Sequence, residues 1–418
     1  MLFGALLALL AIFGAPLFAV IAASALLGYH KEGIDFMAIV VEILGIAGMP
    51  FLSAIPLFTF AGYLLSESNA PHRLVRLTGA VLGWMPGGLA LVALAACAFF
   101  TAFTGASGVT IIALGAILYP ALQKDGYPDD FNLGLVTTSG SLGLLFAPSL
   151  PLILYGVVAE VSIDGLFRAG LLPGMLMLVM LSAYSLWINR SNRKPLNSFS
   201  LREVGEALRE SKWELPLPIV VLGGIYSGFF AVSEAAAVTA LYVLIVEVFI
   251  LKEIRIPDLP KVMRDSMLLV GGILIILGVS LASTNYMIDA GVPQKLLAIV
   301  TEMVTSQFSF LLLLLIFLLI LGAILDIFSA IVLVVPLILP IAAQYGVDEF
   351  HLGIVFLAAM QLGYLTPPVG LNLFIASYRF DRPIMQVYSA TYPFLLILLL
   401  SVIIITYWPA LSLSLLAE

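Results

Sequence analysis

The polar residues that could do chemistry lie at four interruptions of long uncharged runs. Two interruptions are rich in small residues, at 101–108 and 322–329, and two contain proline, at 137–151 and 363–370. Unwound carbonyls and hydroxyl groups are hard oxygen ligands that suit a small cation, whereas half-helix N-termini present N–H groups to an anion. None of the four interruptions contains Lys or Arg. They could therefore hold Na⁺ and a carboxylate together without a buried basic side chain.

Asp326 stands out because it is the only charged residue between 303 and 347. A charge at the bilayer centre costs about 3 kcal/mol, so an intramembrane acid is a functional candidate by default. Asp326 could contact a cation or cap a helical turn, and the sequence leaves both interpretations open. Gln361 and Asn372 flank the Pro367–Pro368 break and could bind a ligand or hold helices together.

The candidate site residues divide between two ligands, a small organic anion and Na⁺. The residues predicted to bind the substrate are Thr104, Ser107, Ser139, Ser141, Ser149, Thr366 and Asn372. The residues predicted to bind Na⁺ are Gly105, Ser107, Gly140, Pro148, Asp326, Ser329, Gly363, Thr366 and Pro367. Ser107 and Thr366 belong to both sets.

Two kinds of membrane element must position these residues. Residues 77–123 contain no charged side chain and no histidine, and they are too long for one span of roughly 20 residues. The small residues at 101–108 therefore predict a re-entrant hairpin, because irregular backbone is tolerated in a bilayer only inside protein or along a cavity. Residues 131–159 are also uncharged, and Pro148 with Pro151 predicts a broken helix there.

Short sequence matches recur at an offset of 219 or 220 residues, with a one-residue gap between the two values. They pair Pro120 with Pro340, Gly126 with Gly346, Phe131 with Phe350, 134–136 with 353–355, and 147–148 with 366–367. Such repeats are typical of secondary transporters, whose substrate site lies near the midplane where the repeats meet. We expect the two copies to be inverted, although the sequence does not fix the number of crossings between them.

The repeat divides the chain into three parts. The first repeat covers 1–189, with a hairpin at about 88–120 and a broken helix at about 131–158. Residues 190–215 form an amphipathic connector. The second repeat covers 216–418, with a hairpin at about 308–341 and a broken helix at about 351–378.

The composition gives the class of protein. Of the 418 residues, 62% are hydrophobic and only 10% are charged, which excludes a soluble enzyme, a nucleic-acid binder and a disordered scaffold. The length allows about ten to twelve crossings of a lipid bilayer. The single cysteine, Cys97, excludes an intramolecular disulfide. The first residues contain no basic segment, and this favours a retained membrane segment over a cleaved signal peptide. We predict an all-α polytopic membrane protein.

The basic residues predict the orientation in the membrane. They gather at 190–212 and 252–264, and the positive-inside rule assigns both loops to the cytoplasm. Residues 200–213 alternate apolar and charged residues with a helical period, which predicts an amphipathic helix on that surface, or a solvated linker helix. Between the loops, Glu234 is expected to cap a helix rather than to bind a ligand. His351 is expected at the membrane interface rather than in a proton relay.

Several longer runs resemble the large membrane subunit of tripartite ATP-independent periplasmic (TRAP) transporters. They are 147–163 (APSLPLILYGVVAEVSI), 166–174 (LFRAGLLPG), 226–242 (YSGFFAVSEAAAVTALY), 322–326 (GAILD), 336–341 (PLILPI), 346–353 (GVDEFHLG) and 363–371 (GYLTPPVGL). The resemblance covers essentially the whole chain, and the runs follow the family's order.

The resemblance implies a Na⁺-driven importer of organic acids in a bacterial or archaeal cytoplasmic (inner) membrane, with Na⁺ as the coupling ion. It implies a small four-helix membrane subunit and a periplasmic substrate-binding protein as partners. It also implies an elevator motion, in which hairpin-bearing elements move against a fixed scaffold. The substrate would be a C4-dicarboxylate, sialic acid or another carboxylate.

Two rival functions can be weighed from the residues. A stand-alone dicarboxylate or citrate carrier, coupled to Na⁺ or H⁺, would share the repeats but need no binding protein. An intramembrane enzyme would need a catalytic pair at midplane depth, and the repeat mate of Asp326 is Ala106, which is not an acid. No phosphate-binding loop of the type G-x-x-x-x-G-K-[ST] occurs, so we expect a transporter that is not an enzyme.

Overall fold

The computed structural model describes residues 15–190 and 199–416, except 47, 50, 51 and 86, together with residues 7, 9, 10 and 13 nearer the N-terminus. Within that part of the chain every regular element is a helix, and no β-strand occurs. The predicted all-α architecture is therefore confirmed.

The helices follow one another with short connections. In chain order they are α2 (Leu17–Glu32), α3 (Met37–Ile46), α4 (Ala54–Glu67), α5 (Ala70–Leu82), α6 (Gly88–Thr104), α7 (Ser107–Ala113), α8 (Gly115–Lys124), α9 (Asp129–Ser139), η1 (Leu142–Leu145), α10 (Leu150–Ala159), α11 (Ile163–Ile188), α12 (Leu201–Glu210), α13 (Pro216–Tyr226), α14 (Val232–Leu244), η2 (Ile245–Ile250), η3 (Ile256–Asp258), α15 (Leu259–Asp289), α16 (Val292–Met303), α17 (Gln307–Gly322), α18 (Ile327–Gln344), α19 (Glu349–Gly363), α20 (Leu371–Phe380), α21 (Ile384–Tyr407) and α22 (Ala410–Leu413).

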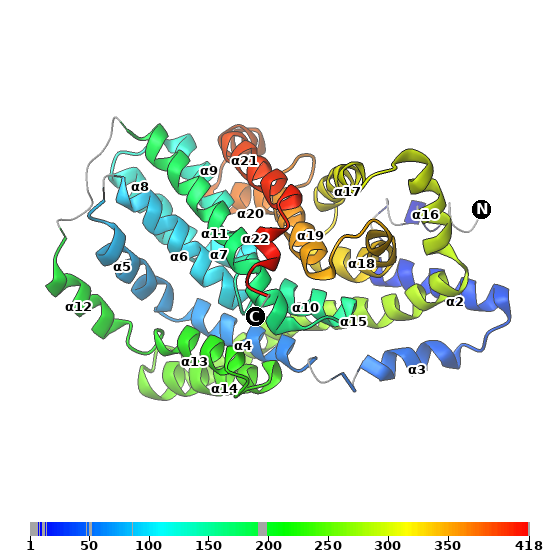
Figure 1. Cartoon of the computed structure of the whole chain (residues 1–418). Helices are drawn as coiled ribbons and strands as arrows, with labels where there is room; N and C mark the ends of the chain where they lie inside the picture. Colours follow the sequence, from blue (N-terminus) through cyan, green and yellow to red (C-terminus); the bar gives the residue numbers. More distant parts are fainter. Residues whose placement is uncertain are drawn as a thin grey trace.

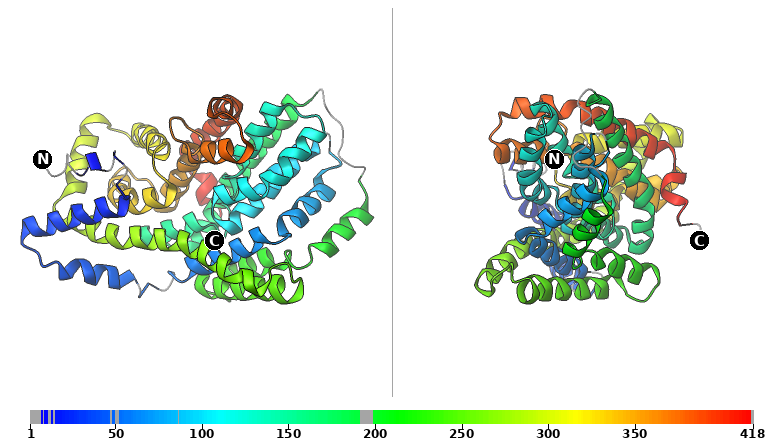
Figure 2. Two further views of the ribbon diagram at one scale, coloured as in Figure 1. Left: turned by 180° about the vertical axis from the view of Figure 1, so that it is seen from behind. Right: turned by 90° about the vertical axis from the view of Figure 1, so that its left-hand side faces the viewer.

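The molecule is elongated, and its two ends are made by different helices. Helices α5, α8 and α12 lie at one end, and α2, α3 and α16 lie at the other (Figure 1). The long helix α15 runs beside α2, as the view from behind also shows (Figure 2). Helices α7 and α18 lie between these ends (Figure 1).

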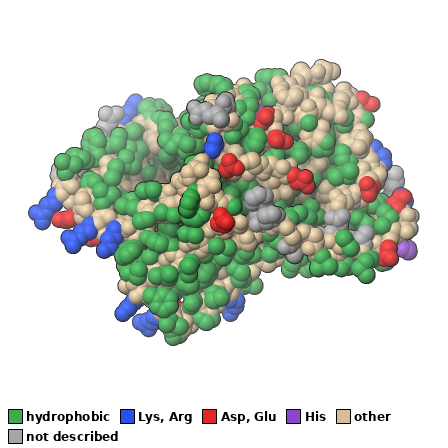
Figure 3. Space-filling view, turned by 60° about the horizontal axis from the view of Figure 1, so that its bottom comes forward, with side chains coloured by type: hydrophobic (Ala, Val, Ile, Leu, Met, Phe, Trp, Pro, Cys, Tyr) green, Lys and Arg blue, Asp and Glu red, His purple; other side chains and the backbone are tan. Residues whose placement is uncertain are grey.

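The structure contains apolar helices long enough to span a bilayer, which supports the assignment of the chain as a membrane protein. Among the described residues, five helices are long and apolar enough to cross a bilayer, and bent helix pairs raise the number to as many as eight. One pair is α7 and α8, which bend by 48°, and another joins 129–145 to 150–159 with a bend of 42°. The space-filling view shows apolar side chains over much of the surface, with Lys and Arg gathered at the end that carries α12 (Figure 3).

The two halves keep one register through the hairpins. Helix α7 begins at Ser107 and α18 begins at Ile327, which lies 220 residues later. Helices α9 and α19 begin at Asp129 and Glu349 with the same separation. The one-residue gap that the sequence matches required is therefore wrong for this segment. The starts of equivalent helices give the alignment of the two repeats better than single identical residues such as Phe131 and Phe350. Identical residues match by chance frequently in an apolar sequence.

Each half packs its later helices on the hairpin of the other half. Helix α10 lies on α18, and α20 lies on α7, which is the equivalent contact with the halves exchanged. In the same way α11 packs on α19, and α21 packs on α9. Hydrogen bonds also join the halves, because Tyr155 on α10 donates to the Glu349 carbonyl on α19 at 2.9 Å and Ser107 on α7 donates to Asn372 on α20 at 2.7 Å. The core of the protein is thus shared between the halves.

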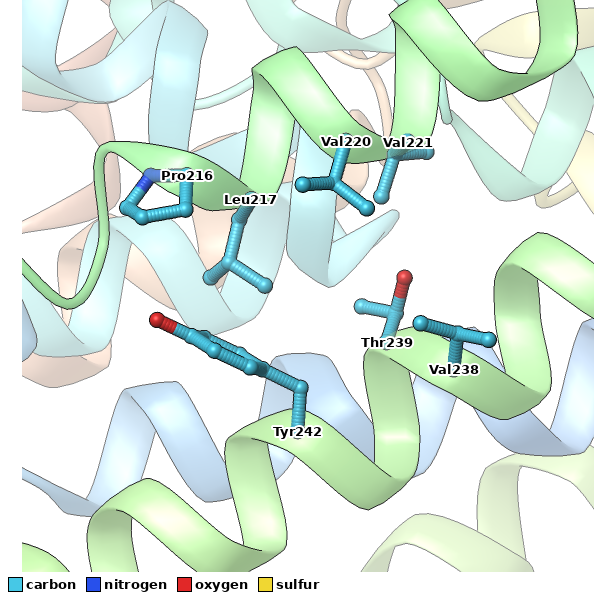
Figure 4. A pocket seen from close by; sticks show the side chains of 7 residues that line it. All are labelled: Pro216, Leu217, Val220, Val221, Val238, Thr239 and Tyr242. Carbon is cyan, nitrogen blue, oxygen red and sulfur yellow. The ribbon is translucent and has the colours of Figure 1, made fainter.

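The connector and the helices after it pack at the same end as α5. Helix α12 is capped by Ser200, whose hydroxyl accepts from the Glu203 N–H at 3.4 Å, and it packs on α5. Glu234 accepts from the Ala231 N–H at 2.9 Å, so the predicted capping role is confirmed. Helices α13 and α14 face each other across an apolar groove (Figure 4). Its cavity of about 30 Å³ is too small for an organic acid.

Candidate functional site

A cavity of about 250 Å³ lies where the two hairpin tips meet. We call 105–108 the first tip and 325–329 the second tip. The wall is formed by both tips and by neighbouring helices: Tyr63, Gly105, Ala106, Ser107, Gly108, Val109, Leu144, Leu269, Asp326, Ile327, Phe328, Tyr364, Leu371 and Ile375. The wall contains no Lys or Arg. Its size and lining suit a small organic molecule with few charges.

The cavity lies where the repeats meet. Four pairs of wall residues are separated by 220 positions, namely Ala106 and Asp326, Ser107 and Ile327, Gly108 and Phe328, and Leu144 and Tyr364. Equivalent positions of the two halves thus face one space. Repeat-built transporters bind their substrates at such an interface.

The first tip depends on a glycine. Gly105 ends α6 with φ at +65°, a conformation that residues with a Cβ rarely adopt. A Cβ at this position would also lie 2.4 Å from Cγ of Leu150. The chain can therefore turn here and remain packed against α10 only if residue 105 has no side chain.

Ser107 presents lone pairs to the cavity. Its hydroxyl donates to Oδ1 of Asn372 at 2.7 Å. The amide nitrogen of Asn372 faces the Thr137 carbonyl at 3.5 Å, which fixes the orientation of the amide group. Because the Ser107 proton is used in this bond, its oxygen offers only acceptor capacity to a ligand. This polarity favours a cation over a carboxylate at Ser107.

The second tip is capped by an acid. Oδ1 of Asp326 accepts from the Phe328 and Ser329 N–H groups, both at 3.0 Å. Its other oxygen accepts from the Ser329 hydroxyl. Of the two interpretations left open by the sequence, the capping one is confirmed. The carboxylate also belongs to the cavity wall, so contact with a cation stays a prediction.

Tyr364 is a wall residue that sequence reasoning missed. Its hydroxyl accepts from the Ile327 N–H at 2.8 Å, and its side chain is only 3% exposed. It therefore ties the end of α19 to the first turn of α18. The available signal was its place in the 363–371 run, between Gly363 and the proline break.

Around the first broken helix, the predicted residues lie behind the wall. Ser139 and Ser141 donate to carbonyls of their own turns, those of Val136 and Thr138, at 3.3 Å. The Gly140 carbonyl accepts from the Thr101 hydroxyl at 2.9 Å. The hydroxyl oxygens of Thr104, Thr138 and Ser149 are buried with no hydrogen-bond partner in the described part of the chain. Pro148 is buried too.

The second broken helix is more open. Thr366 is half-buried and donates to the Leu362 carbonyl at 3.1 Å, and Pro367 is exposed. Gly363 packs directly on Gly322, because a Cβ on Gly363 would lie 2.5 Å from that backbone. The equivalent contact in the first half joins Gly143 to Ala102, where the distance is also 2.5 Å. Both hairpins therefore pack closely on their broken helices.

Only part of the predicted site forms the wall. Gly105, Ser107 and Asp326 line the cavity, while Asn372 and Ser329 lie one hydrogen bond behind it. The other predicted residues do not line it: Thr104, Ser139, Gly140, Ser141, Pro148, Ser149, Gly363, Thr366 and Pro367. Gln361 is also buried outside the wall, with its amide nitrogen 2.8 Å from the Met177 sulfur.

His351 is more enclosed than an interfacial residue. Its side chain is 2% exposed, and its ring nitrogens lie 3.3 Å from the Ser412 hydroxyl and 3.1 Å from the Thr406 carbonyl. The ring is covered by α21 and α22, and its expected place at the depth of the membrane interface stays a prediction. Neither ring nitrogen faces the cavity wall described above.

A second charged group, also missed from the sequence, lies away from the cavity. Arg73 on α5 contacts Glu214, Glu247 and Glu253, at 2.6 Å for Glu214 and 3.4 Å for Glu247. Burial raises the pKa of Glu214, and Arg73 opposes this shift. Burial would also raise the pKa of Glu253, but hydrogen bonds from Arg73 and the Asn69 N–H hold that pKa below its ordinary value. The four residues join α5 to the connector and to the end of α14.

Comparisons with known proteins agree on the family. The model of the DctM component of tripartite ATP-independent periplasmic transporters matches residues 3–411. The C4-dicarboxylate TRAP transporter large permease protein DctM of Pseudomonas aeruginosa is 36% identical over 365 residues, covering 87% of this chain and 86% of that protein. The isethionate TRAP transporter permease protein DctMQ of Oleidesulfovibrio alaskensis is 32% identical over 361 residues, covering 86% of this chain and 57% of that protein.

A solved structure shares the fold. The YdaH transporter of Alcanivorax borkumensis superposes with a TM-score of 0.62 at 15% sequence identity, covering 89% of this chain and 87% of that one. This likeness concerns the fold alone. The chain belongs to the DctM component family of tripartite ATP-independent periplasmic transporters, and it is a multi-pass membrane transport protein rather than an enzyme.

Proposed function

We propose that this chain is the permease subunit of a Na⁺-driven importer of a small organic acid. The observation that carries the proposal is the cavity of about 250 Å³ at the junction of the repeats, with one carboxylate and no basic side chain in its wall. An organic anion in such a space needs a cation to offset repulsion from Asp326. Na⁺ that enters with the substrate would provide that charge.

The substrate is proposed from the relatives together with the cavity. The relatives described above are named for C4-dicarboxylates and for isethionate, which are small organic anions. The cavity of about 250 Å³ has room for molecules of this size. We therefore propose a C4-dicarboxylate as the first substrate to test.

Two groups of oxygen atoms are the proposed Na⁺ ligands. At the second tip they are the carboxylate of Asp326 and the hydroxyl of Ser329, and at the first tip the lone pairs of Ser107. Behind the first tip, the buried hydroxyl oxygens of Thr104 and Ser149 lack hydrogen-bond partners among the described residues, and their lone pairs would be satisfied by coordinating a cation. Carboxylate and hydroxyl oxygens without thiolate or imidazole suit a hard cation.

The proposed orientation makes the repeats inverted. Both basic loops lie in the cytoplasm by the positive-inside rule, and α11 and α15 each cross the membrane once from there. The first hairpin then enters from the cytoplasm and the second from the opposite side. Movement of the two hairpins with the cavity would carry substrate across the membrane in an elevator motion.

The energy available depends on the number of Na⁺ ions. One ion entering down a tenfold gradient yields about 1.4 kcal/mol, and each net charge adds about 2.3 kcal/mol at 100 mV. Two Na⁺ with a dianion yield about 2.8 kcal/mol, enough for roughly 100-fold accumulation. A third Na⁺ raises the total to about 6.5 kcal/mol and makes transport electrogenic. Steep accumulation without a current would contradict three-ion coupling.

The family assignment also suggests the partners and the location. We propose that a small four-helix membrane subunit and a periplasmic substrate-binding protein complete the system, in the cytoplasmic membrane of a bacterium or archaeon. The test is succinate uptake into proteoliposomes that contain this chain and the small subunit, with and without the binding protein, under an imposed Na⁺ gradient. We expect uptake to require both Na⁺ and the binding protein. Uptake without the binding protein would favour a stand-alone carrier, and uptake driven by H⁺ would remove the Na⁺ assignment.

A further inference from the structure

We propose that the Tyr364 hydroxyl donates a hydrogen bond to the carboxylate of the transported acid, and so helps to select carboxylates. The inference rests on the proposed function, because it assigns a residue to substrate recognition in the same cavity. It differs from the sequence prediction, which assigned substrate binding to serine and threonine hydroxyl groups and to Asn372 and did not include Tyr364.

The first step of the argument concerns the hydrogen bond that Tyr364 already makes. Its oxygen accepts from the Ile327 N–H at 2.8 Å, so one lone pair is occupied. A phenol hydroxyl has one proton to donate as well. Within the described residues no acceptor for that proton lies within hydrogen-bond reach, although the side chain is only 3% exposed.

The second step concerns what could accept that proton. Buried tyrosine hydroxyls nearly always find a partner, and Tyr364 lines the cavity. A cation cannot accept a hydrogen bond, so the missing partner is an acceptor such as a carboxylate oxygen. Asp326 lies in the same wall, but its oxygens accept from the backbone of the second tip and from Ser329, and no hydrogen bond joins them to the Tyr364 hydroxyl.

The third step concerns which of the two hairpin tips the substrate carboxylate approaches. The residue equivalent to Tyr364 in the first half is Leu144, which also lines the wall but has no donor. At the first tip, the Ser107 proton is used by Asn372. The carboxylate of a substrate is therefore drawn toward the second tip. There it would approach Asp326, and the repulsion between the two carboxylates makes its binding depend on Na⁺.

The test separates a donor from a structural support. We would measure equilibrium binding of radiolabelled succinate to the purified complex of this chain with its small subunit in saturating Na⁺, for wild type and Tyr364→Phe. Loss of a hydrogen bond to a charged group predicts a rise in Kd of about tenfold to a hundredfold. Na⁺ binding is measured separately, without succinate, because an ion that binds the folded protein raises its Tm. The quantity compared is the Na⁺ concentration at which half of this rise in Tm is reached.

A donor role and a purely structural role of Tyr364 predict different outcomes. A donor role raises the Kd for succinate and leaves the half-saturating Na⁺ concentration within about twofold, because Asp326 keeps its own hydrogen bonds. A purely structural role at the second tip would shift both quantities together and would overturn the proposal. An unchanged Kd for succinate would also overturn it, while uptake by the wild type would still support the proposed function.

A matched tyrosine supplies the control. Tyr388 donates to the Pro368 carbonyl at 2.7 Å beside the second break, and it does not line the cavity. Tyr388→Phe removes the same atom and should leave the Kd for succinate within about twofold of wild type. An equal loss in both variants would overturn the assignment to Tyr364. If wild-type proteoliposomes show no Na⁺-dependent uptake of succinate, the proposed function fails and the inference fails with it.

Discussion

The two hairpin tips occupy equivalent positions but differ in chemistry. In the first tip, Ala106 precedes α7 with an extended backbone, and no side chain caps the helix. In the second tip, Asp326 precedes α18 with an extended backbone and caps it with a carboxylate. The first tip turns through Gly105 in a left-handed conformation, whereas the second uses no residue with positive φ.

The difference shows how a repeat can keep a backbone plan while its halves specialise. The separation of 220 residues is retained through both tips, so the meeting point of the hairpins is preserved. The side chains give one negative wall at the second tip and one neutral wall at the first. A cation and an anion can then bind side by side at defined places, which a fully symmetric cavity would not distinguish.

The largest effect is expected from removing the charge at the second tip. Asn caps helices about as well as Asp, so Asp326→Asn should leave the Tm nearly unchanged. If the carboxylate contacts Na⁺, its loss costs about 3–5 kcal/mol, or more than a hundredfold in Na⁺ affinity. Uptake measured against Na⁺ concentration tests this expectation. Normal Na⁺ dependence in the variant would leave Asp326 with the capping role alone.

A smaller but still large effect is expected at the turn of the first tip. Gly105→Ala forces a Cβ into a left-handed position beside Leu150, which should cost about 2–4 kcal/mol of stability. The measurement is the Tm of the purified protein, together with uptake. Gly79→Ala is the control, because a Cβ there meets no atom within 4 Å and should be neutral or slightly stabilising. Equal Tm values for the two variants would contradict the packing described here.

The asymmetry of charge can be tested by making the tips alike. Ala106→Asp adds a carboxylate to the wall at the position equivalent to Asp326. Repulsion of a carboxylate substrate should cost about 1–2 kcal/mol, which weakens succinate binding roughly five- to thirtyfold. Ala106→Asn is similar in size but neutral, so its affinity should stay within about threefold of wild type. Equal weakening by both variants would show that size, and not charge, matters at the first tip.

The smallest effect concerns the pH dependence of stability. It tests whether the Arg73 group acts independently of the cavity. The lowered pKa of Glu253 stabilises the fold above the ordinary pKa of a glutamate, and this contribution is lost as pH falls through its pKa in the folded protein. Glu253→Gln should therefore lower the stability at neutral pH by about 1 kcal/mol and reduce the further loss in acid. Melting curves at neutral and acidic pH test this. A change in Na⁺ dependence of uptake would instead link this group to the second tip.

The sequence predicted the elements better than the contacts between them. Uncharged runs interrupted by small residues or proline predicted where helices break, because the bilayer tolerates irregular backbone only in protected places. Helices α6, α9, α17 and α19 do end within or at these interruptions. Which side chains form one wall depends on helix rotation and on the packing of distant segments. Thr366 and Ser149 were chosen by residue type, yet neither lines the cavity.

The missed residues share a physical cause. Tyr364 looks like a packing residue in an apolar run, and only its bond to the Ile327 N–H distinguishes it. Arg73 is 141 residues from Glu214 and 180 from Glu253, so no local pattern joins them. The prediction that Asp326 is important rested on the cost of a buried charge, which requires no knowledge of distant contacts.

The exchanged packing of the halves has a consequence for the synthesis of the protein. Ser107 and Asn372 are 265 residues apart. At translation rates of about 5–20 residues per second, the first hairpin emerges roughly 13–50 s before its partner helix. During that interval the polar turn around Ser107 lacks the helix that will cover it.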